Sequence, residues 1–158
     1  MNMKTNRNTD TYADRISEHF TWSEMQRSDT ARRMGIDNTV PEGPARQAVI
    51  LLVTRVLQPL RKAWGGPLVI NSGYRSPELN EAVGGVPGSQ HVRGEAADIA
   101  APDPLLLAQT AVRSRIPFDQ MILYSTFVHI SHRPRAPQRG QILYDISYRQ
   151  HYPDSTEL

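Results

Sequence analysis

Residues 89–100 read Ser-Gln-His-Val-Arg-Gly-Glu-Ala-Ala-Asp-Ile-Ala, and their second half predicts a β-strand over residues 96–100. Side chains alternate along a strand, so Ala97 and Ile99 share one face. Asp98 lies on the other face, between two alanines. A carboxylate flanked by such small side chains leaves room for another group to approach it.

The histidine of this stretch, His91, lies seven positions before Asp98. On one regular strand an odd spacing would place the two side chains on opposite faces. Gly94 lies between them and offers a position where the backbone can bend, because glycine adopts conformations that other residues avoid. Such a bend would swing His91 round beside Asp98.

A further strand candidate, residues 127–131, reads Phe-Val-His-Ile-Ser. By the same alternation Val128 and Ile130 face the core, whereas His129 lies on a face that need not be apolar.

Two imidazoles and one carboxylate suit a catalytic zinc site, because three protein ligands leave the fourth position open to water. Zinc lowers the pKa of such a water to about 7 and polarises a carbonyl group. From spacing alone a structural interpretation stays open. In it His91 is a surface-loop residue, Asp98 belongs to a strand edge and His129 is satisfied within its strand.

The remaining chain predicts helices first and strands later. A helix is expected from Pro41 to about Ala63, with a kink near Gln58 because Pro59 interrupts its hydrogen bonding. Gly65 then ends it. A later helix is expected over residues 104–115, and strands over residues 68–70, 96–100, 120–123, 127–131 and 141–146. This order indicates an α+β fold with a small, mainly antiparallel sheet and flanking helices.

The composition is typical of a globular domain, with 158 residues, 39% hydrophobic and 22% charged. Cysteine is absent from the sequence, which excludes disulfides, thiolate zinc ligands and a cysteine nucleophile. Lysine and arginine number 18 against 16 aspartates and glutamates, and the basic residues are scattered. We therefore expect no nucleic-acid partner, no membrane insertion and a monomer.

The organisation along the chain is expected to be simple: a polar N-terminal arm over residues 1–16, a single domain over 17–150 and a C-terminal tail over 151–158. The N-terminus lacks the apolar region of a secretory signal, which predicts synthesis in the cytoplasm without standard export. An extracytoplasmic target would then be reached after lysis or aboard a particle.

Five segments carry a family resemblance: Ser-Gly-Tyr-Arg-Ser-Pro-Glu-Leu-Asn at 72–80, Val-Gly-Gly at 83–85, Ser-Gln-His at 89–91, Gly-Glu-Ala-Ala-Asp at 94–98 and Val-His-Ile-Ser at 128–131. Together they resemble the zinc D-Ala-D-Ala carboxypeptidase family, in particular the branch that includes phage peptidoglycan endopeptidases. The resemblance covers about residues 19–131. It implies a fold shared with the Hedgehog signalling domain and zinc held by His91, Asp98 and His129.

The resemblance also implies two substrate-binding residues, Arg75 and Ser89. Chemistry supports Arg75, because stem peptides of the wall end in carboxylates and arginine pairs with these groups bidentately. The structural alternatives are a salt bridge from Arg75 to Glu78 or Glu81, and a loop-capping role for Ser89.

One position departs from the family's pattern. Many members carry Asp or Glu three residues before the last histidine ligand, as general base, whereas this chain has Thr126. Asp119, which begins a neighbouring strand, is our candidate for the catalytic proton carrier. Glu95 and His132 are alternatives, although strand parity turns both away from the site. In the remaining alternative the base is lost, which costs about 10²–10⁴ in rate.

The sequence therefore predicts a zinc metallopeptidase that hydrolyses peptidoglycan stem peptides, as a D-Ala-D-Ala carboxypeptidase or an L-Ala-D-Glu endopeptidase. The expected cofactor is Zn2+, and the expected partners are the stem peptides. By the resemblance the chain would be a phage endolysin released through a holin, or a virion component. The alternative is a non-catalytic zinc domain that binds cell-wall fragments or a protein partner, which Thr126 favours.

Overall fold

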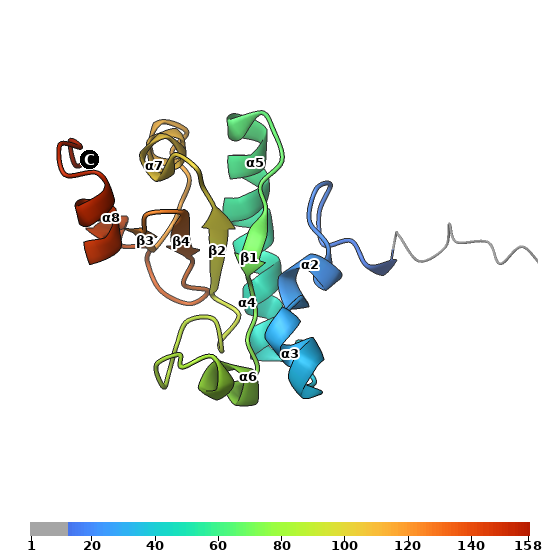
Figure 1. Cartoon of the computed structure of the whole chain (residues 1–158). Coiled ribbons are helices and arrows are strands. Elements are labelled where there is room, and N and C mark those ends of the chain that lie inside the picture. Colours follow the sequence, from blue (N-terminus) through green and yellow to red (C-terminus); the bar gives the residue numbers. More distant parts are fainter. Residues whose placement is uncertain (1–12) are drawn as a thin grey trace, which may run out of the picture.

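A computed structural model describes residues 13–158 as an open sheet of five strands with helices around it (Figure 1). The strands are β1 (Ile70–Ser72), β2 (Ala96–Ala100), β3 (Gln120–Leu123), β4 (Phe127–Ser131) and β5 (Gln141–Tyr144). Their order in the sheet is β1-β2-β4-β3-β5, and every neighbouring pair is antiparallel except β3 and β5. The predicted α+β fold with a mainly antiparallel sheet is confirmed.

Seven α-helices and one π-helical segment surround the sheet within the described residues. They are α2 (Trp22–Gln26), α3 (Asp29–Met34), α4 (Pro44–Leu52), η1 (Val53–Leu57), α5 (Gln58–Trp64), α6 (Pro77–Ala82), α7 (Pro104–Arg113) and α8 (Ile146–His151). Helices α4 and α5 form one long column beside β1 and β2, as Figure 1 shows.

The expected kink in the long helix takes the form of the π-helical segment η1. There the N–H of Gln58 donates to the carbonyl of Val53, five residues back. Pro59 follows at once, and it has no N–H and crowds the carbonyl of the preceding turn. The wider turn accommodates the proline without ending the helix. The column ends at Gly65, as predicted, in the left-handed conformation with φ 78°.

Two strands differ from their predicted bounds. Strand β1 occupies residues 70–72 rather than 68–70, because its pairing with β2 begins at Ile70, opposite Ile99. The predicted strand over 141–146 ends at Tyr144, and an unpredicted helix, α8, follows. The side chain of Asp145 caps α8 by accepting a hydrogen bond from the N–H of Ser147, and Tyr148 anchors it in the core.

The core lies between one face of the sheet and the helices α4, α5 and α7. Ile99, Val128 and Ile130 point into it and are at most 1% exposed, as strand alternation predicts. Asp98 and His129 therefore lie on the opposite face. Among the described residues, no helix is both long and apolar enough to cross a bilayer. The division into arm, domain and tail stays a prediction, and residues 1–12 lie outside the described part of the chain.

Candidate metal centre

The centre begins with a pair of side chains on two neighbouring strands. Asp98 of β2 lies directly opposite His129 of β4 in the antiparallel ladder. Residues opposite each other project to the same face of a sheet and approach closely. The Nδ1 atom of His129 lies 3.0 Å from Oδ1 of Asp98.

The third side chain comes from the loop before β2, through the bend predicted at Gly94. Gly94 has φ 73°, and a Cβ at this position would lie 2.5 Å from the carbonyl oxygen of Ala45 in α4. The loop is therefore pressed against α4 at a point that only glycine fits. The bend carries His91 to the sheet face, where its Nε2 lies 3.2 Å from Oδ1 of Asp98.

Each imidazole is oriented by a hydrogen bond on its far nitrogen. Nδ1–H of His91 donates to the carbonyl of Gly73 over 2.7 Å, and Nε2–H of His129 donates to Oε1 of Gln90 over 2.8 Å. A carbonyl oxygen only accepts, so each neutral ring carries its proton there and turns a lone pair toward Asp98. Two lone pairs that converge on one carboxylate oxygen are satisfied by a cation between them.

The charge of Asp98 completes this arrangement. Burial alone would raise the pKa of Asp98, whereas hydrogen bonds and positive charge from His129 and His91 in their protonated forms lower that pKa below its usual range. Beside the neutral rings, a bound cation takes the place of these protons. Asp98 is thus ionised at neutral pH. Each of the three residues offers one ligand atom, and these three atoms all lie within 4.8 Å of one another. A donor set of two imidazoles and one carboxylate fits zinc, with a coordination position left for water.

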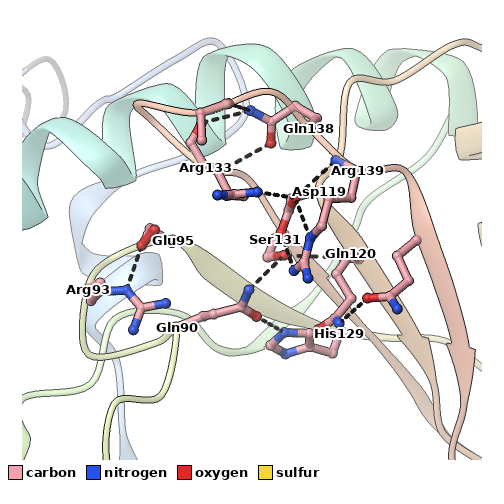
Figure 2. A network of polar contacts seen from close by, with 12 residues as sticks. Gln90, Arg93, Glu95, Asp119, Gln120, His129, Ser131, Arg133, Gln138 and Arg139 are labelled. Atoms are coloured by element: carbon pink, nitrogen blue, oxygen red, sulfur yellow. Dashed lines mark hydrogen bonds and ion pairs between the residues drawn. The ribbon is translucent and has the colours of Figure 1, made fainter.

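Gln90 is a residue that the sequence interpretation missed. Its side chain bridges His129 and β4, because its Nε2 donates to Oγ of Ser131 over 3.3 Å while its Oε1 accepts from His129 (Figure 2). A hydrogen bond of this kind to the far nitrogen of the ring fixes the tautomer and orientation of a metal-binding histidine. The only signal in the sequence was its place between two motif residues, Ser89 and His91.

The centre opens into a cavity of about 380 Å³. Besides the three ligand candidates, its walls include both predicted substrate-binding residues, Arg75 and Ser89, and the aromatic side chains of Tyr124 and Phe127. The two aromatic rings stack, with centroids 4.2 Å apart. The structure therefore brings five of the six predicted site residues to one place.

The alternative role of Arg75 was a salt bridge to Glu78 or Glu81. No such ion pair forms within residues 13–158. The Nε of Arg75 is buried without a hydrogen-bond partner in the described structure. Burial lowers the pKa of Arg75, and the nearby Asp98 opposes that change. A buried donor without a partner is costly, so this guanidinium is prepared for an acceptor that enters the cavity. Ser89 accepts a hydrogen bond from the N–H of His91 over 3.3 Å, which makes it a loop cap at the cavity wall.

Asp119, the predicted proton carrier, lies elsewhere. Its carboxylate is fully buried and accepts hydrogen bonds from the backbone, Nε and Nη2 of Arg139 over 2.8–3.1 Å (Figure 2). The side-chain hydrogen bonds from Arg139 lower the pKa of Asp119. It does not line the metal cavity. A carboxylate held in this way is a weak base, so its contacts fit a structural clamp on the loop before β5 better than proton transfer.

The other candidates for the base also lie away from the cavity. Glu95 pairs with Arg93 over 2.8 Å, and neither Glu95 nor His132 lines the cavity. His132 is 2% exposed, and burial lowers its pKa. Thr126 is exposed in the turn between β3 and β4 and is absent from the cavity walls. In this chain, a carboxylate side chain at position 126 would therefore project from a residue that lies outside the cavity walls.

Comparison with known proteins identifies the family of this chain. The sequence profile of the family Peptidase M15 matches residues 18–131, which is most of the chain. The zinc D-Ala-D-Ala carboxypeptidase of Streptomyces albus G is 34% identical over 84 residues, covering 52% of this chain and 31% of that protein. The chain thus aligns with about a third of that relative's length. With the profile match and a ligand set that fits zinc, the chain belongs to the peptidase M15 family of zinc metallopeptidases.

Proposed function

We propose that this chain hydrolyses peptide bonds in the stem peptides of bacterial peptidoglycan, with zinc held by His91, Asp98 and His129. The observation that carries the proposal is the convergence of two oriented imidazoles on one half-buried, ionised carboxylate at an open cavity. The name of the relative from Streptomyces albus G, a zinc D-Ala-D-Ala carboxypeptidase, supports the substrate class.

Bound zinc supplies Lewis acidity, which polarises a carbonyl group and acidifies water. The chain's own residues bind and orient the substrate. Arg75 lines the cavity and presents its guanidinium to a substrate carboxylate. Ser89 stands at the cavity wall and holds the His91 backbone in place.

Proton transfer requires an ionisable group that reaches the metal cavity. Asp98 is the only carboxylate among the described residues that line the cavity. The phenol of Tyr124 also lines it, and burial raises the pKa of Tyr124, so it donates rather than accepts a proton at neutral pH. Asp119, the proton carrier predicted from the sequence, would have to exchange Arg139 for water to serve, and its ion pair with Arg139 favours a structural role instead.

Action on the cell wall is part of the proposal, after release through a holin or as a virion component. Incubating purified peptidoglycan with the zinc-loaded protein and analysing the products by mass spectrometry tests the activity. We expect a zinc-dependent product whose mass identifies the bond, and none with His91→Ala. Intact stem peptides from several wall types, with zinc binding confirmed, would instead support a non-catalytic zinc domain that binds wall fragments.

A further inference from the structure

The metal cavity extends past the candidate ligands toward β3. Its walls include Gln120 and Ile122 of β3, whereas Arg75, which follows β1, lines it on the other side of the ligands. In the sheet order β1-β2-β4-β3-β5 the strands that carry Asp98 and His129 lie between these two sides. The cavity therefore runs across the strands, and β5 is the strand that comes next in its direction.

Strand β5 continues the metal-bearing face of the sheet. It pairs in parallel with β3, and Leu143 lies opposite Ile122, which in turn lies opposite His129. Residues opposite each other project to the same face, so Leu143 shares the face of the metal centre. Leu143 is 40% exposed and Gln141 is also exposed, which leaves this part of the face open to a ligand.

A pair of glutamines connects the cavity wall to β5 by direct contact. Nε2 of Gln120 donates to Oε1 of Gln141 over 2.7 Å. Within residues 13–158 neither carboxamide makes another hydrogen bond, so Oε1 of Gln120 and Nε2 of Gln141 stay available. One free acceptor beside one free donor complements a secondary amide, which has one N–H and one C=O.

The C-terminal segment holds this wall in place. The N–H of Asp145, directly after β5, donates to the carbonyl of Leu123 at the end of β3 over 2.9 Å. The N–H of Ser125, in the turn that carries the two stacked aromatic rings, donates to Oγ of Ser147 in α8 over 3.2 Å. Figure 1 shows α8 next to β3. Strand β5 and α8 follow residue 131, where the family match ends, and they make a fixed extension of the cavity wall.

We infer that β5 forms a substrate subsite beside the metal cavity, in which Gln141 and Leu143 bind a secondary amide that carries a methyl group. The inference rests on the proposed peptidase function and deepens it. The glutamine pair binds the amide, and the methyl group packs on Ile122 and Leu143. These four side chains carry no charge, so the subsite selects a neutral group. An alanine peptide unit and the N-acetyl group of muramic acid both have this chemistry.

The sheet spacing gives the place of this group in the substrate. Neighbouring strands lie about 4.8 Å apart, so β5 is about 10 Å from His129. An extended chain covers about 3.4 Å per residue, and three residues therefore span this distance. With a C-terminal carboxylate at Arg75, the bound group precedes the cleaved bond. It is the N-acetyl group of the sugar when the stem is cut after its first residue, and the first alanine when the last bond is cut.

Shortened substrates test the subsite. The probes are N-acetylmuramyl pentapeptide, the free pentapeptide and the tetrapeptide that lacks the first alanine, and product masses identify the cleaved bond. We expect kcat/KM of the zinc-loaded enzyme to fall about tenfold when the group at that place is removed, the sugar or the alanine. Unchanged kcat/KM on that removal would overturn the subsite. If no probe is cut although zinc is bound, the proposed peptidase function itself fails.

A double variant, Gln141→Ala with Leu143→Ser, tests the two side chains. For the substrate that keeps the group we expect kcat/KM to fall about tenfold, and for the shortened substrate several-fold less. Zinc affinity, measured by chelator competition, should equal that of the wild type, because β5 lies two strands from His129. Gln150→Ala with Val112→Ser changes the same residue types at exposed positions on α8 and α7 and should leave both substrates unchanged. Equal losses on both substrates, or none, would contradict the assignment.

Gln141→Glu separates substrate contact from positioning of Gln120. Glutamate keeps an acceptor oxygen for Nε2 of Gln120 but offers no N–H to a substrate. For the substrate that keeps the group we expect Gln141→Glu to lose as much kcat/KM as Gln141→Ala, mainly through a higher KM, as for binding energy that is unrelated to the chemical step. Wild-type kinetics in Gln141→Glu would show that Gln141 only orients Gln120, and the direct contact would be excluded.

Discussion

The roles of Gln90 and Asp119 depend on individual contacts that the sequence does not reveal. The amide of Gln90 bridges Ser131 and His129, and by accepting a hydrogen bond from Nε2–H it leaves Nδ1 free to bind metal. Asp119, a residue type suited to catalysis, is instead neutralised by Arg139. The difference arises from neighbours that lie far away in the sequence.

Replacing Gln90 tests its role in holding His129. We expect Gln90→Ala to weaken zinc binding about 10–100-fold, which is typical when the hydrogen-bond partner of a ligand is lost. Gln90→Glu keeps an acceptor oxygen and should recover most of the affinity. Chelator competition measures the affinity, and 15N NMR of the His129 ring reports its tautomer. Unchanged affinity and tautomer in Gln90→Ala would exclude the orienting role.

Asp119→Asn tests whether this residue is structural. Its pKa is lowered in the folded state, so its stabilising contribution is complete above the ordinary aspartate pKa of about 4 and is lost as the pH falls toward the folded-state value. We expect Asp119→Asn to reduce the free energy of unfolding at pH 7 by about 1–3 kcal/mol. The difference from wild type should shrink below about pH 4 in urea titrations.

Activity measurements on the same variant separate structure from catalysis. Per folded, zinc-loaded molecule, we expect Asp119→Asn to lose less than about tenfold in kcat, whereas removal of a general base costs about 10²–10⁴. A loss in that higher range would establish Asp119 as the proton carrier. Asp154→Asn, at an exposed position near the C-terminus, serves as the control for both measurements.

At the scale of elements, the loop before β2 positions His91 by pressing on α4. Gly94 makes this approach, and its carbonyl neighbour, Ala45 O, belongs to helix backbone that cannot rotate away. Behind the site, Gly73 packs against Met25 in the same way, and its carbonyl orients His91. Gly94 and Gly73 thus both help to position His91.

Gly94→Ala is expected to destabilise the fold and weaken zinc binding. Gly88→Ala is the matched control, because Gly88 also has positive φ, 76°, but open space around its Cβ position. Both variants carry the cost of an unfavourable φ, and only Gly94→Ala adds the steric clash. We expect Gly94→Ala to lose about 1–3 kcal/mol more than Gly88→Ala in urea denaturation. Equal losses would mean that the contact with α4 relaxes freely.

At the scale of the whole molecule, the metal centre and the hydrophobic core occupy opposite faces of one sheet. The core side chains of β2 and β4, including Ile99 and Ile130, are buried against helices on the face away from the candidate ligands. The three candidate zinc ligands add one point of contact among β2, β4 and the preceding loop. Zinc should therefore stabilise a fold that already exists rather than create it.

Removal of zinc tests this view. We expect the chelated protein to keep its far-UV circular dichroism and a cooperative melt, at a lower Tm. Zinc at 100 times its Kd should restore about 2.7 kcal/mol. His129→Ala should melt at the same temperature with and without zinc. Unfolding on chelation would show that the sheet depends on the metal.

The parts of the structure that the sequence determined by itself are those governed by local alternation and local backbone chemistry. Strands β2, β3 and β4 have the predicted bounds. The alternation of core-facing and outward-facing side chains depends only on the residues of the strand itself, so it can be recognised in the sequence. The bend at Gly94 and the end of the long helix at Gly65 follow from what glycine alone tolerates.

Tertiary structure decided the rest, because the deciding partners lie far apart along the chain. Arg139, 20 residues away, makes Asp119 an ion-pair partner. Register against β2 creates the bulge at Asn71 of β1. Gln90 acquires its role only when β4 brings His129 within 2.8 Å of its amide. Contacts of this kind depend on how elements pack, and no local pattern in the sequence encodes them.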